Sequence, residues 1–310
     1  MKARDLTDLL LLAAIWGASF LFMRMAVPAF GPVALAFVRV SGAALFLLPL
    51  LLWRGEWPAL RQHWRTLLVL GLTNSALPFL CFGYAVTTLP AGLAALFNAA
   101  TPLSTALIAW AWLGTPLTRW RSLGLALGFV GVVGLGLYKS LLGGSLQALQ
   151  FDHQTALAVG ACLAGTLLYG HAASYARRYL AGVPAMAMAA GTQLAASVAL
   201  LLPALWAWPA ANPAPGDWLL AAALAVLASG VAYILYFRLI SHVGPTQAAS
   251  VTFLVPVFAS VWGALVLGEV VSTPMLVGGA VILAGTALVL GLIPRPRPAT
   301  PPATPAAPTA

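Results

Sequence analysis

The residues of this sequence that could do chemistry are polar and aromatic side chains embedded in long apolar stretches. A polar group without a partner is costly in an apolar environment, so such residues indicate hydrogen bonds that hold the fold or contacts with a bound solute. Each aromatic residue taken singly is better explained by packing, but together the set indicates the lining of a cavity. The predicted binding residues are Trp16, Ser19, Asn74, Pro78, Tyr84, Asn98, Thr101, Tyr169, His171, Tyr233 and Thr252.

Two prolines interrupt apolar stretches at matched places, since Pro102 and Pro256 are 154 residues apart. A proline inside a helix removes one backbone hydrogen bond and bends the helix, which leaves a carbonyl free to face a cavity. Asn98 and Thr252 lie one helical turn before these prolines, where a side chain could serve the freed backbone or a ligand. Both alternatives stay open, and the prolines are predicted to have a gating or structural role.

Two ionisable residues lie inside apolar stretches, and Glu269 lies at the end of another. The first, Arg39, is roughly seven residues into its stretch, and Glu269 is predicted to have a gating or structural role like Arg39. An arginine inside a membrane needs a partner or water. Arg39 could hold the carboxylate of a solute, but a structural bond to backbone carbonyls or to Glu269 is favoured. His171 is the only histidine well inside an apolar stretch, and a neutral, hydrogen-bonded ring is favoured there over a proton relay.

The sequence lacks several features that other functions would need. There is no HExxH, GxSxG, phosphate-binding loop or CxxC motif, so we expect neither an enzyme nor a bound cofactor or metal. Cys81 and Cys162 both fall inside apolar stretches and are interpreted as small buried side chains. The acids all lie at the ends of these stretches or in loops, at Asp5, Asp8, Glu56, Asp152, Asp217 and Glu269.

The position of the acids bears on energy coupling. Carriers driven by protons or sodium commonly place a carboxylate near the middle of the membrane. Because this sequence places none there, it predicts weak or absent obligatory ion coupling.

Composition defines the elements that must position these residues. Of the 310 residues, 62% are hydrophobic and only 7% are charged, too few to cover a water-soluble body. Apolar runs of about 20 residues can each cross ~30 Å of hydrocarbon, and there the backbone must satisfy its own hydrogen bonds as a helix. We therefore predict an all-α membrane protein with transmembrane helices over 7–27, 32–53, 66–86, 91–113, 119–138, 155–176, 184–207, 218–240, 246–267 and 274–293.

The basic residues indicate how these ten helices are oriented. If the N-terminus is cytoplasmic, twelve of the 15 Lys and Arg residues fall on the cytoplasmic side, against Arg24, Arg39 and Lys139 on or near the other. This asymmetry predicts two cytoplasmic termini in a bacterial inner membrane. The net charge of +9 is scattered between apolar runs, which excludes a nucleic-acid partner and leaves a small-molecule substrate and the lipid bilayer. A monomer is expected, with a homodimer as the alternative.

The two halves of the chain resemble each other. WGASFLFMR at 16–24 matches YGHAASYAR at 169–177, and PLSTALIAWAWLG at 102–114 matches PVFASVWGALVLG at 256–268. An odd number of helices in each half inverts the second half relative to the first, which suits alternating access around a site between the halves. The predicted organisation is a first repeat over 1–138, a loop over 139–153, a second repeat over 154–293 and a disordered Pro-rich tail over 294–310.

These stretches resemble the EamA-type branch of the drug/metabolite transporter superfamily. WGASFLFMR, the arginine in the second helix, PAGLAALFNAATPLSTALIAWAWLG and LVPVFASVWGALVLGE carry the resemblance, which covers about residues 7–293. It implies ten helices in two inverted repeats and transport of small organic solutes, often by export. The acid that ends the LGE motif is present as Glu269 in the second half, whereas the first half has Thr115.

The sequence therefore predicts a carrier of small organic metabolites that works by alternating access. An exporter of amino acids, aromatic ones included, or of similar solutes is favoured because the predicted cavity is aromatic and carries few charges. A carrier that expels amphipathic drug-like compounds is the second interpretation. A channel or a non-transporting membrane subunit is the alternative from another class of protein.

Overall fold

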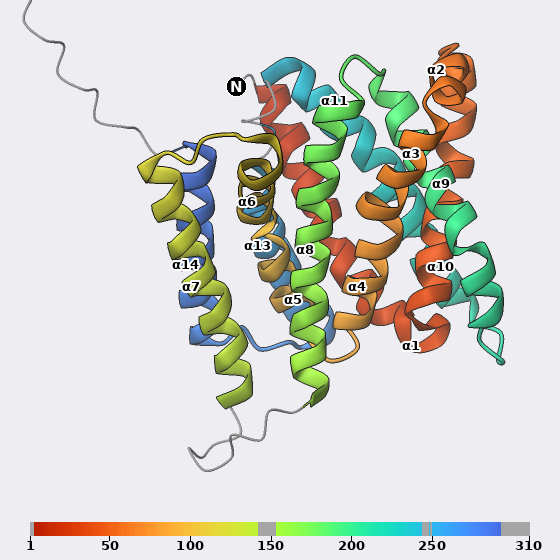
Figure 1. Ribbon diagram of the computed structural model, residues 1–310. Coiled ribbons are helices and arrows are strands. Elements are labelled where there is room, and N and C mark those ends of the chain that lie inside the picture. Colours follow the sequence, from red (N-terminus) through yellow and green to blue (C-terminus); the bar gives the residue numbers. More distant parts are fainter. Residues whose placement is uncertain (1–2, 142–152, 244–247, 249, 293–310) are drawn as a thin grey trace, which may run out of the picture.

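The computed structural model describes residues 3–141, 153–243, 248 and 250–292, and these residues form helices with no strand among them (Figure 1). The all-α prediction is therefore confirmed for the described part of the chain. The predicted loop over 139–153 lies largely, and the predicted disordered tail over 294–310 wholly, outside the described residues.

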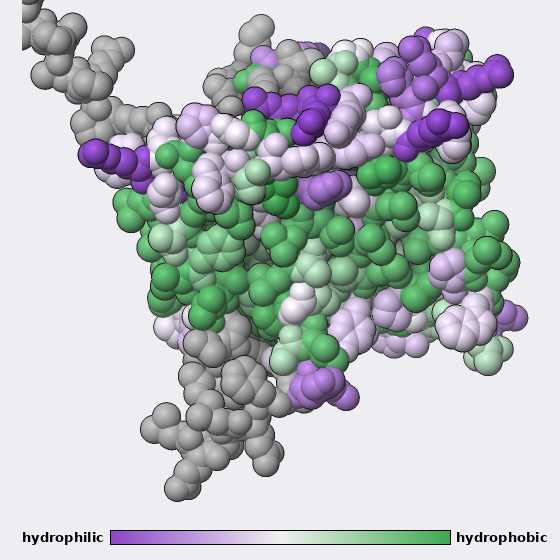
Figure 2. Space-filling model, in the orientation of Figure 1, coloured by the Kyte–Doolittle hydropathy of each residue, from purple (hydrophilic) through white to green (hydrophobic). Residues whose placement is uncertain are grey.

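Several helices are suited to a membrane. Seven of the described helices are long and apolar enough to cross one, and the shorter apolar helix Val251–Leu267 accompanies them. Figure 2 shows a broad hydrophobic band across the face of the molecule in view, with hydrophilic residues gathered mainly along the upper edge of that face. The band places apolar side chains against lipid and polar ones at the membrane boundary.

The first helix, α1 (Ala3–Trp53), is 51 residues long and is bent into two arms. Gly31 has φ 73° and ψ 162°, a backbone conformation that is essentially restricted to glycine, and Pro28 and Pro32 flank it. The arms correspond to the predicted helices 7–27 and 32–53. The short helix α2 (Trp57–Gln62) follows, and the sequence analysis did not anticipate it.

The predicted helix 66–86 consists of α3 (Trp64–Gly71), the π-helical segment η1 (Leu72–Ala76) and α4 (Leu77–Ala85). The predicted helix 218–240 is built in the same way, from α10 (Pro215–Ala223), the π-helical η2 (Leu224–Val231) and α11 (Ala232–Val243). A π-helical turn widens a helix locally and turns side chains out of the regular pattern.

The predicted helix 91–113 is interrupted, and this corrects the expectation for Pro102. It forms α5 (Ala91–Asn98) and α6 (Thr101–Leu113), with Pro102 in the first turn of α6. A proline is tolerated there because the first-turn N–H groups have no partner within the helix. Pro256, by contrast, lies inside α13 (Val251–Leu267), as expected.

The remaining helices complete a bundle in which segments from both halves of the chain lie side by side (Figure 1). These remaining helices are α7 (Arg119–Leu141), α8 (His153–Tyr179), α9 (Ala185–Trp206) and α14 (Thr273–Leu290). The most extensive contact is between α7 in the first half and α14 in the second.

Two close helix crossings occur at matched places in the two halves. At Gly17, a Cβ atom would lie 2.9 Å from the backbone nitrogen of Ala259, so α1 and α13 cross with almost no space between them. At Gly170, a Cβ atom would lie 2.8 Å from the backbone nitrogen of Thr105, so α8 and α6 cross in the same manner. Gly17 and Gly170 are 153 residues apart, and Thr105 and Ala259 are 154 apart. Small residues allow such close approach between membrane helices.

Candidate functional site

A cavity of about 530 Å³ lies among helices from both halves of the chain. Its walls come from α1, η1, α4, α5, α6, α8, η2, α11 and α13, with contributions from α7 and α14. Several lining residues belong to the interruptions described above, since Asn74 lies in η1 and Asn98, Thr101 and Pro102 lie at the α5–α6 break.

The cavity brings together eight of the eleven predicted binding residues. The structure places Arg39 and Pro102 on the same wall surface as well. The eight residues are Trp16, Ser19, Asn74, Asn98, Thr101, Tyr169, Tyr233 and Thr252.

Three predicted binding residues do not line the cavity. Pro78 is buried in the first turn of α4, and Tyr84 is exposed on the surface of the same helix. His171 lies on α8 and is not among the lining residues. Membrane depth alone, which the sequence indicates, does not fix the direction in which a side chain points.

The polar groups of the cavity are partly held by the protein itself. Trp16 Nε1 donates to the carbonyl of Ala228 at 3.2 Å, and Asn74 Nδ2 donates to the hydroxyl of Tyr233 at 3.2 Å. Thr101 Oγ1 donates to the carbonyl of Asn98 at 2.7 Å, which is the carbonyl that the ring of Pro102 leaves without its usual helical donor. Thr101 therefore serves the backbone, while the Asn98 side chain faces the cavity.

Arg39 is almost fully buried, with 6% of its surface exposed. Its Nε donates to Ser229 Oγ at 2.9 Å, and its guanidinium carbon lies 3.8 Å from the centre of the Phe79 ring. The predicted alternative in which Arg39 bonds to Glu269 is wrong, because Glu269 pairs with Arg24 at 2.8 Å.

His171 packs in an aromatic cluster outside the cavity. Its ring stacks on Trp112 with centroids 5.2 Å apart and planes 7° apart. The expected hydrogen bond is missing at Nδ1, which is buried without a hydrogen-bond partner among the described residues. The ring is therefore held by stacking.

His171→Phe is expected to leave solute flux within about twofold of the wild type. Phenylalanine keeps a flat ring against Trp112 and removes the unsatisfied nitrogen, whose burial costs about 1–3 kcal/mol. Flux into proteoliposomes and the melting temperature in detergent measure the two effects. A large loss of flux at an unchanged melting temperature would restore the proton-relay alternative.

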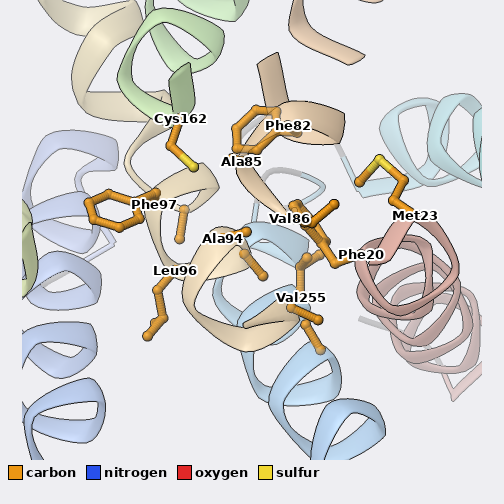
Figure 3. Close-up of a cluster of buried hydrophobic side chains, with 14 of the residues drawn as sticks. Phe20, Met23, Phe82, Ala85, Val86, Ala94, Leu96, Phe97, Cys162 and Val255 are labelled. Carbon is orange, nitrogen blue, oxygen red and sulfur yellow. The ribbon is translucent and has the colours of Figure 1, made fainter. Parts of the chain in front are cut away.

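One end of the cavity is closed by apolar side chains. Phe20, Phe82 and Val255 line the cavity, and they pack with Val86 in the buried cluster of Figure 3. Phe20 and Phe82 meet edge to face with ring centroids 5.7 Å apart. Val86 also lines a second hollow, and none of the residues that line this hollow is among those that line the cavity.

An ion pair lies in that second hollow and ties three segments together. Arg24 Nε lies 2.8 Å from Glu269 Oε1, and Arg24 Nη1 donates to the carbonyls of Val86 and Leu89 at 3.0 and 2.7 Å. Both oxygens of Glu269 accept from the backbone N–H of Ala91, at 3.1 and 3.0 Å. The cation meets the C-terminal end of α4 and the anion the N-terminal end of α5, as the helix dipoles favour.

The other end of the cavity reaches toward the edge of the molecule where the N-terminus lies. Arg121 at the start of α7 and Arg177 near the end of α8 are among the lining residues, together with Thr115 and Leu117 of the α6–α7 connection. Arg177 is exposed, and Arg121 and Thr115 are half-buried. The cavity is therefore closed at one end and lined at the other by two basic side chains, of which Arg177 is exposed.

Several lining residues were not among those predicted from the sequence. Met23, Phe79 and Phe82 are apolar residues among many, and nothing in the sequence distinguishes them from packing residues. Arg24 and Arg177 were identified as matched residues of the two halves, which was a usable signal that they occupy comparable places. Their proximity to Glu269 or to the cavity depends on helix packing.

Comparison with known families identifies the class of protein. The profile of the EamA-like transporter family matches two consecutive stretches, residues 8–137 and 156–291. Together the two stretches cover most of the chain, and the chain belongs to this family of membrane transporters.

Individual relatives agree with this assignment. The chain is 28% identical to the uncharacterized inner membrane transporter YedA of Escherichia coli over 89% of its length and 88% of that protein. It is 26% identical to the uncharacterized transporter YvbV of Bacillus subtilis over 93% and 92% of the two chains. A solved crystal structure with 20% sequence identity shares the fold at a TM-score of 0.65, over 94% of this chain and 98% of the other.

Proposed function

We propose that this transporter carries a small organic metabolite by alternating access, with the central cavity as its binding site. The observation that carries the proposal is a cavity between the two halves that is closed at one end by an apolar layer and the Arg24–Glu269 pair. Lining residues with exposed side chains lie at the other end. A carrier needs such a one-sided cavity, whereas a channel needs a continuous path when it conducts.

Ten transmembrane helices in two inverted repeats, over 1–138 and 154–293, form part of this proposal. Seven described helices are long and apolar enough to cross a membrane, and α1 is one of them. Counting the two arms of α1 separately and adding α7 and α13 would give ten. The reciprocal crossings at Gly17 and Gly170 and the twofold family match support a repeat. Two halves of similar structure can exchange conformations around one site.

The proposed orientation puts both termini in the cytoplasm of a bacterial cell, with the chain in the inner membrane. The asymmetry of the basic residues supports this orientation, since twelve of the 15 then lie inside. The Arg24–Glu269 pair would then close the outer side, and the cavity would open to the cytoplasm. A cavity open to the cytoplasm can load a solute for export.

Amino acids, aromatic ones included, are the proposed substrates, with amphipathic drug-like compounds as the second candidate. The cavity lining supports a solute with an apolar body, because Trp16, Phe79, Phe82, Tyr169 and Tyr233 all contribute rings. Its volume is in the range of sites for small organic molecules.

Counterflow in proteoliposomes tests the proposal directly. Vesicles with the purified protein are loaded with one unlabelled solute from a metabolite panel, and entry of the same labelled solute is followed. A carrier gives transient accumulation that saturates with concentration, for at least one amino acid under the leading hypothesis. Flux that rises linearly without saturation would indicate a channel, and no accumulation for any amino acid would defeat the leading substrate class.

Uptake is further expected to continue without an ion gradient. No Asp or Glu is among the residues that line the described cavity, so the cavity has no carboxylate to take up a proton or sodium ion. Initial rates with and without an imposed pH gradient or sodium should agree within about twofold. Strict dependence on either gradient would contradict this prediction.

A further inference from the structure

Arg39 carries a positive charge that no acidic side chain of the described residues neutralises. It is the buried cation of the cavity wall, and none of the ion pairs among the described residues includes it. Its partners are the neutral Ser229 hydroxyl, the Met23 sulfur at 3.5 Å and the face of the Phe79 ring. A buried charge is costly unless an opposite charge or water compensates it.

The matched position in the second half shows what a purely structural side chain does at this place. Gln193 lies 154 residues after Arg39, and Ser75 lies 154 residues before Ser229. Gln193 Nε2 donates to Ser75 Oγ at 3.2 Å, so the two halves make reciprocal contacts. A neutral amide therefore suffices for the bond to the serine.

The two positions differ in what they face. Arg39 lines the cavity, whereas Gln193 is fully buried and is not among the lining residues. The positive charge thus occurs only in the half where the side chain reaches the cavity. The contact between the halves therefore does not require the positive charge of Arg39.

The rest of the cavity has the same electrostatic sign. Arg121 and Arg177 line its open end, and no acidic residue is among the lining residues of the described chain. Clefts lined by charges of one sign attract ions of the opposite sign. The cavity is therefore suited to anions and unsuited to organic cations.

We infer that Arg39 binds the carboxylate of the transported solute, so that the substrates are organic acids or amino acids with an apolar or aromatic body. This inference rests on the proposed function and specifies its substrate class. The guanidinium presents several N–H donors to a carboxylate in a fixed geometry, while Phe79 lies against its face. The rings of Tyr169 and Phe82, stacked with centroids 6.1 Å apart, offer a surface for the apolar part of the solute.

A matched set of three ligands tests the inference. Tryptophan, tryptamine and indole-3-propionate share one ring system, but tryptamine lacks the carboxylate and indole-3-propionate lacks the amine. Binding is measured as ligand-induced stabilisation of the purified protein, which requires no transport. The two carboxylates should bind, and tryptamine should bind at least tenfold more weakly.

Arg39→Gln is the decisive variant because glutamine keeps the bond to serine that Gln193 makes. It should weaken binding of the acids about 10- to 100-fold, the range for losing a hydrogen bond to a charged group. Arg39→Lys keeps a point charge and should recover part of the affinity. Gln193→Met, at the matched position outside the cavity, should leave the affinity for the acids within about twofold.

Three results would overturn the inference. The first is that tryptamine stabilises the wild-type protein as strongly as the two carboxylates do. The second is that the Arg39→Gln variant keeps the wild-type melting temperature and binds the two carboxylates with unchanged affinity. The third is that sodium chloride, at the same concentration as the two carboxylates, stabilises the protein equally, which would make Arg39 a site for an inorganic counter-ion only. Failure of the proposed function is distinguishable, because it appears as absent counterflow while the acids still bind.

Discussion

Glu269→Gln is expected to open the closed end of the cavity. The substitution keeps the shape of the side chain but removes the negative charge of the carboxylate, which lies 2.8 Å from Arg24. The same carboxylate accepts hydrogen bonds from the N–H of Ala91. The Arg24 side chain is 31% exposed and that of Glu269 11%, so we expect a loss of about 1–2 kcal/mol, well below that of a fully buried pair. The population of molecules open at this end should rise roughly 5- to 30-fold.

Thiol accessibility measures this shift. Ala106→Cys, in a background with Cys81 and Cys162 replaced, places one thiol on the cavity wall. A membrane-impermeant maleimide should reach it in the parent protein from the Arg121 and Arg177 end only. With Glu269→Gln added, labelling from the opposite side should increase by the same factor as the population.

Glu56→Gln provides the matched control. Glu56 Oε2 also accepts from a backbone N–H near a helix start, that of Ala187 at 3.1 Å, but forms no ion pair among the described residues. It should leave labelling from both sides unchanged. Equal labelling in parent, control and Glu269→Gln would show that the ion pair does not hold the cavity closed.

At the opposite end of the cavity, none of the ion pairs among the described residues includes Thr115, Arg121 or Arg177, and the reason lies in one residue. The N–H of Glu269 donates to the carbonyl of Gly263, and the N–H of Thr115 donates to that of Ala109, both at 3.1 Å. The two connections thus have the same backbone geometry, with an acid only in the second. Thr115 lines the same cavity as Arg177, so Thr115→Glu should favour closure of that end and lower the labelling of Ala106→Cys.

Gly17→Ala is expected to destabilise the protein by about 1–3 kcal/mol and to reduce flux. The added methyl group would lie 2.6 Å from Phe258 Cβ, 2.9 Å from the nitrogen of Ala259 and 3.0 Å from the carbonyl of Val255. Two of these three atoms belong to the backbone, so α1 must move away from α13 along the cavity wall. Thermal unfolding in detergent and counterflow in proteoliposomes measure the two effects.

Two further alanine substitutions make the experiment specific. Gly170→Ala, at the matched crossing of α8 and α6, should behave like Gly17→Ala because the Cβ would lie 2.8 Å from backbone atoms of Ser104 and Thr105. Gly160→Ala adds a methyl group where nothing lies within 4 Å, and should be neutral or stabilise by up to about 1 kcal/mol through helix propensity. The same change in melting temperature for all three variants would refute the role of close crossing.

The sequence by itself determined the class of structure. The low fraction of charge and the repeated apolar runs require membrane helices, because the hydrocarbon layer offers the backbone no other hydrogen-bond partners. The resemblance of the two halves predicted comparable positions for Arg24 and Arg177, which end the matched stretches at 16–24 and 169–177. Such properties depend on composition and spacing along the chain, which are read without knowledge of packing.

The tertiary structure decided which side chains face the cavity and which partners they have. Asn74 and Tyr84 lie on one predicted helix, yet Asn74 in the π-helical segment lines the cavity and Tyr84 faces outward. Glu269 pairs with Arg24, whereas a bond to Arg39 had been one of the alternatives from the sequence. The physical reason is that hydropathy reports depth in the membrane, whereas the rotation of each helix and its partners are set by close packing at a few small residues.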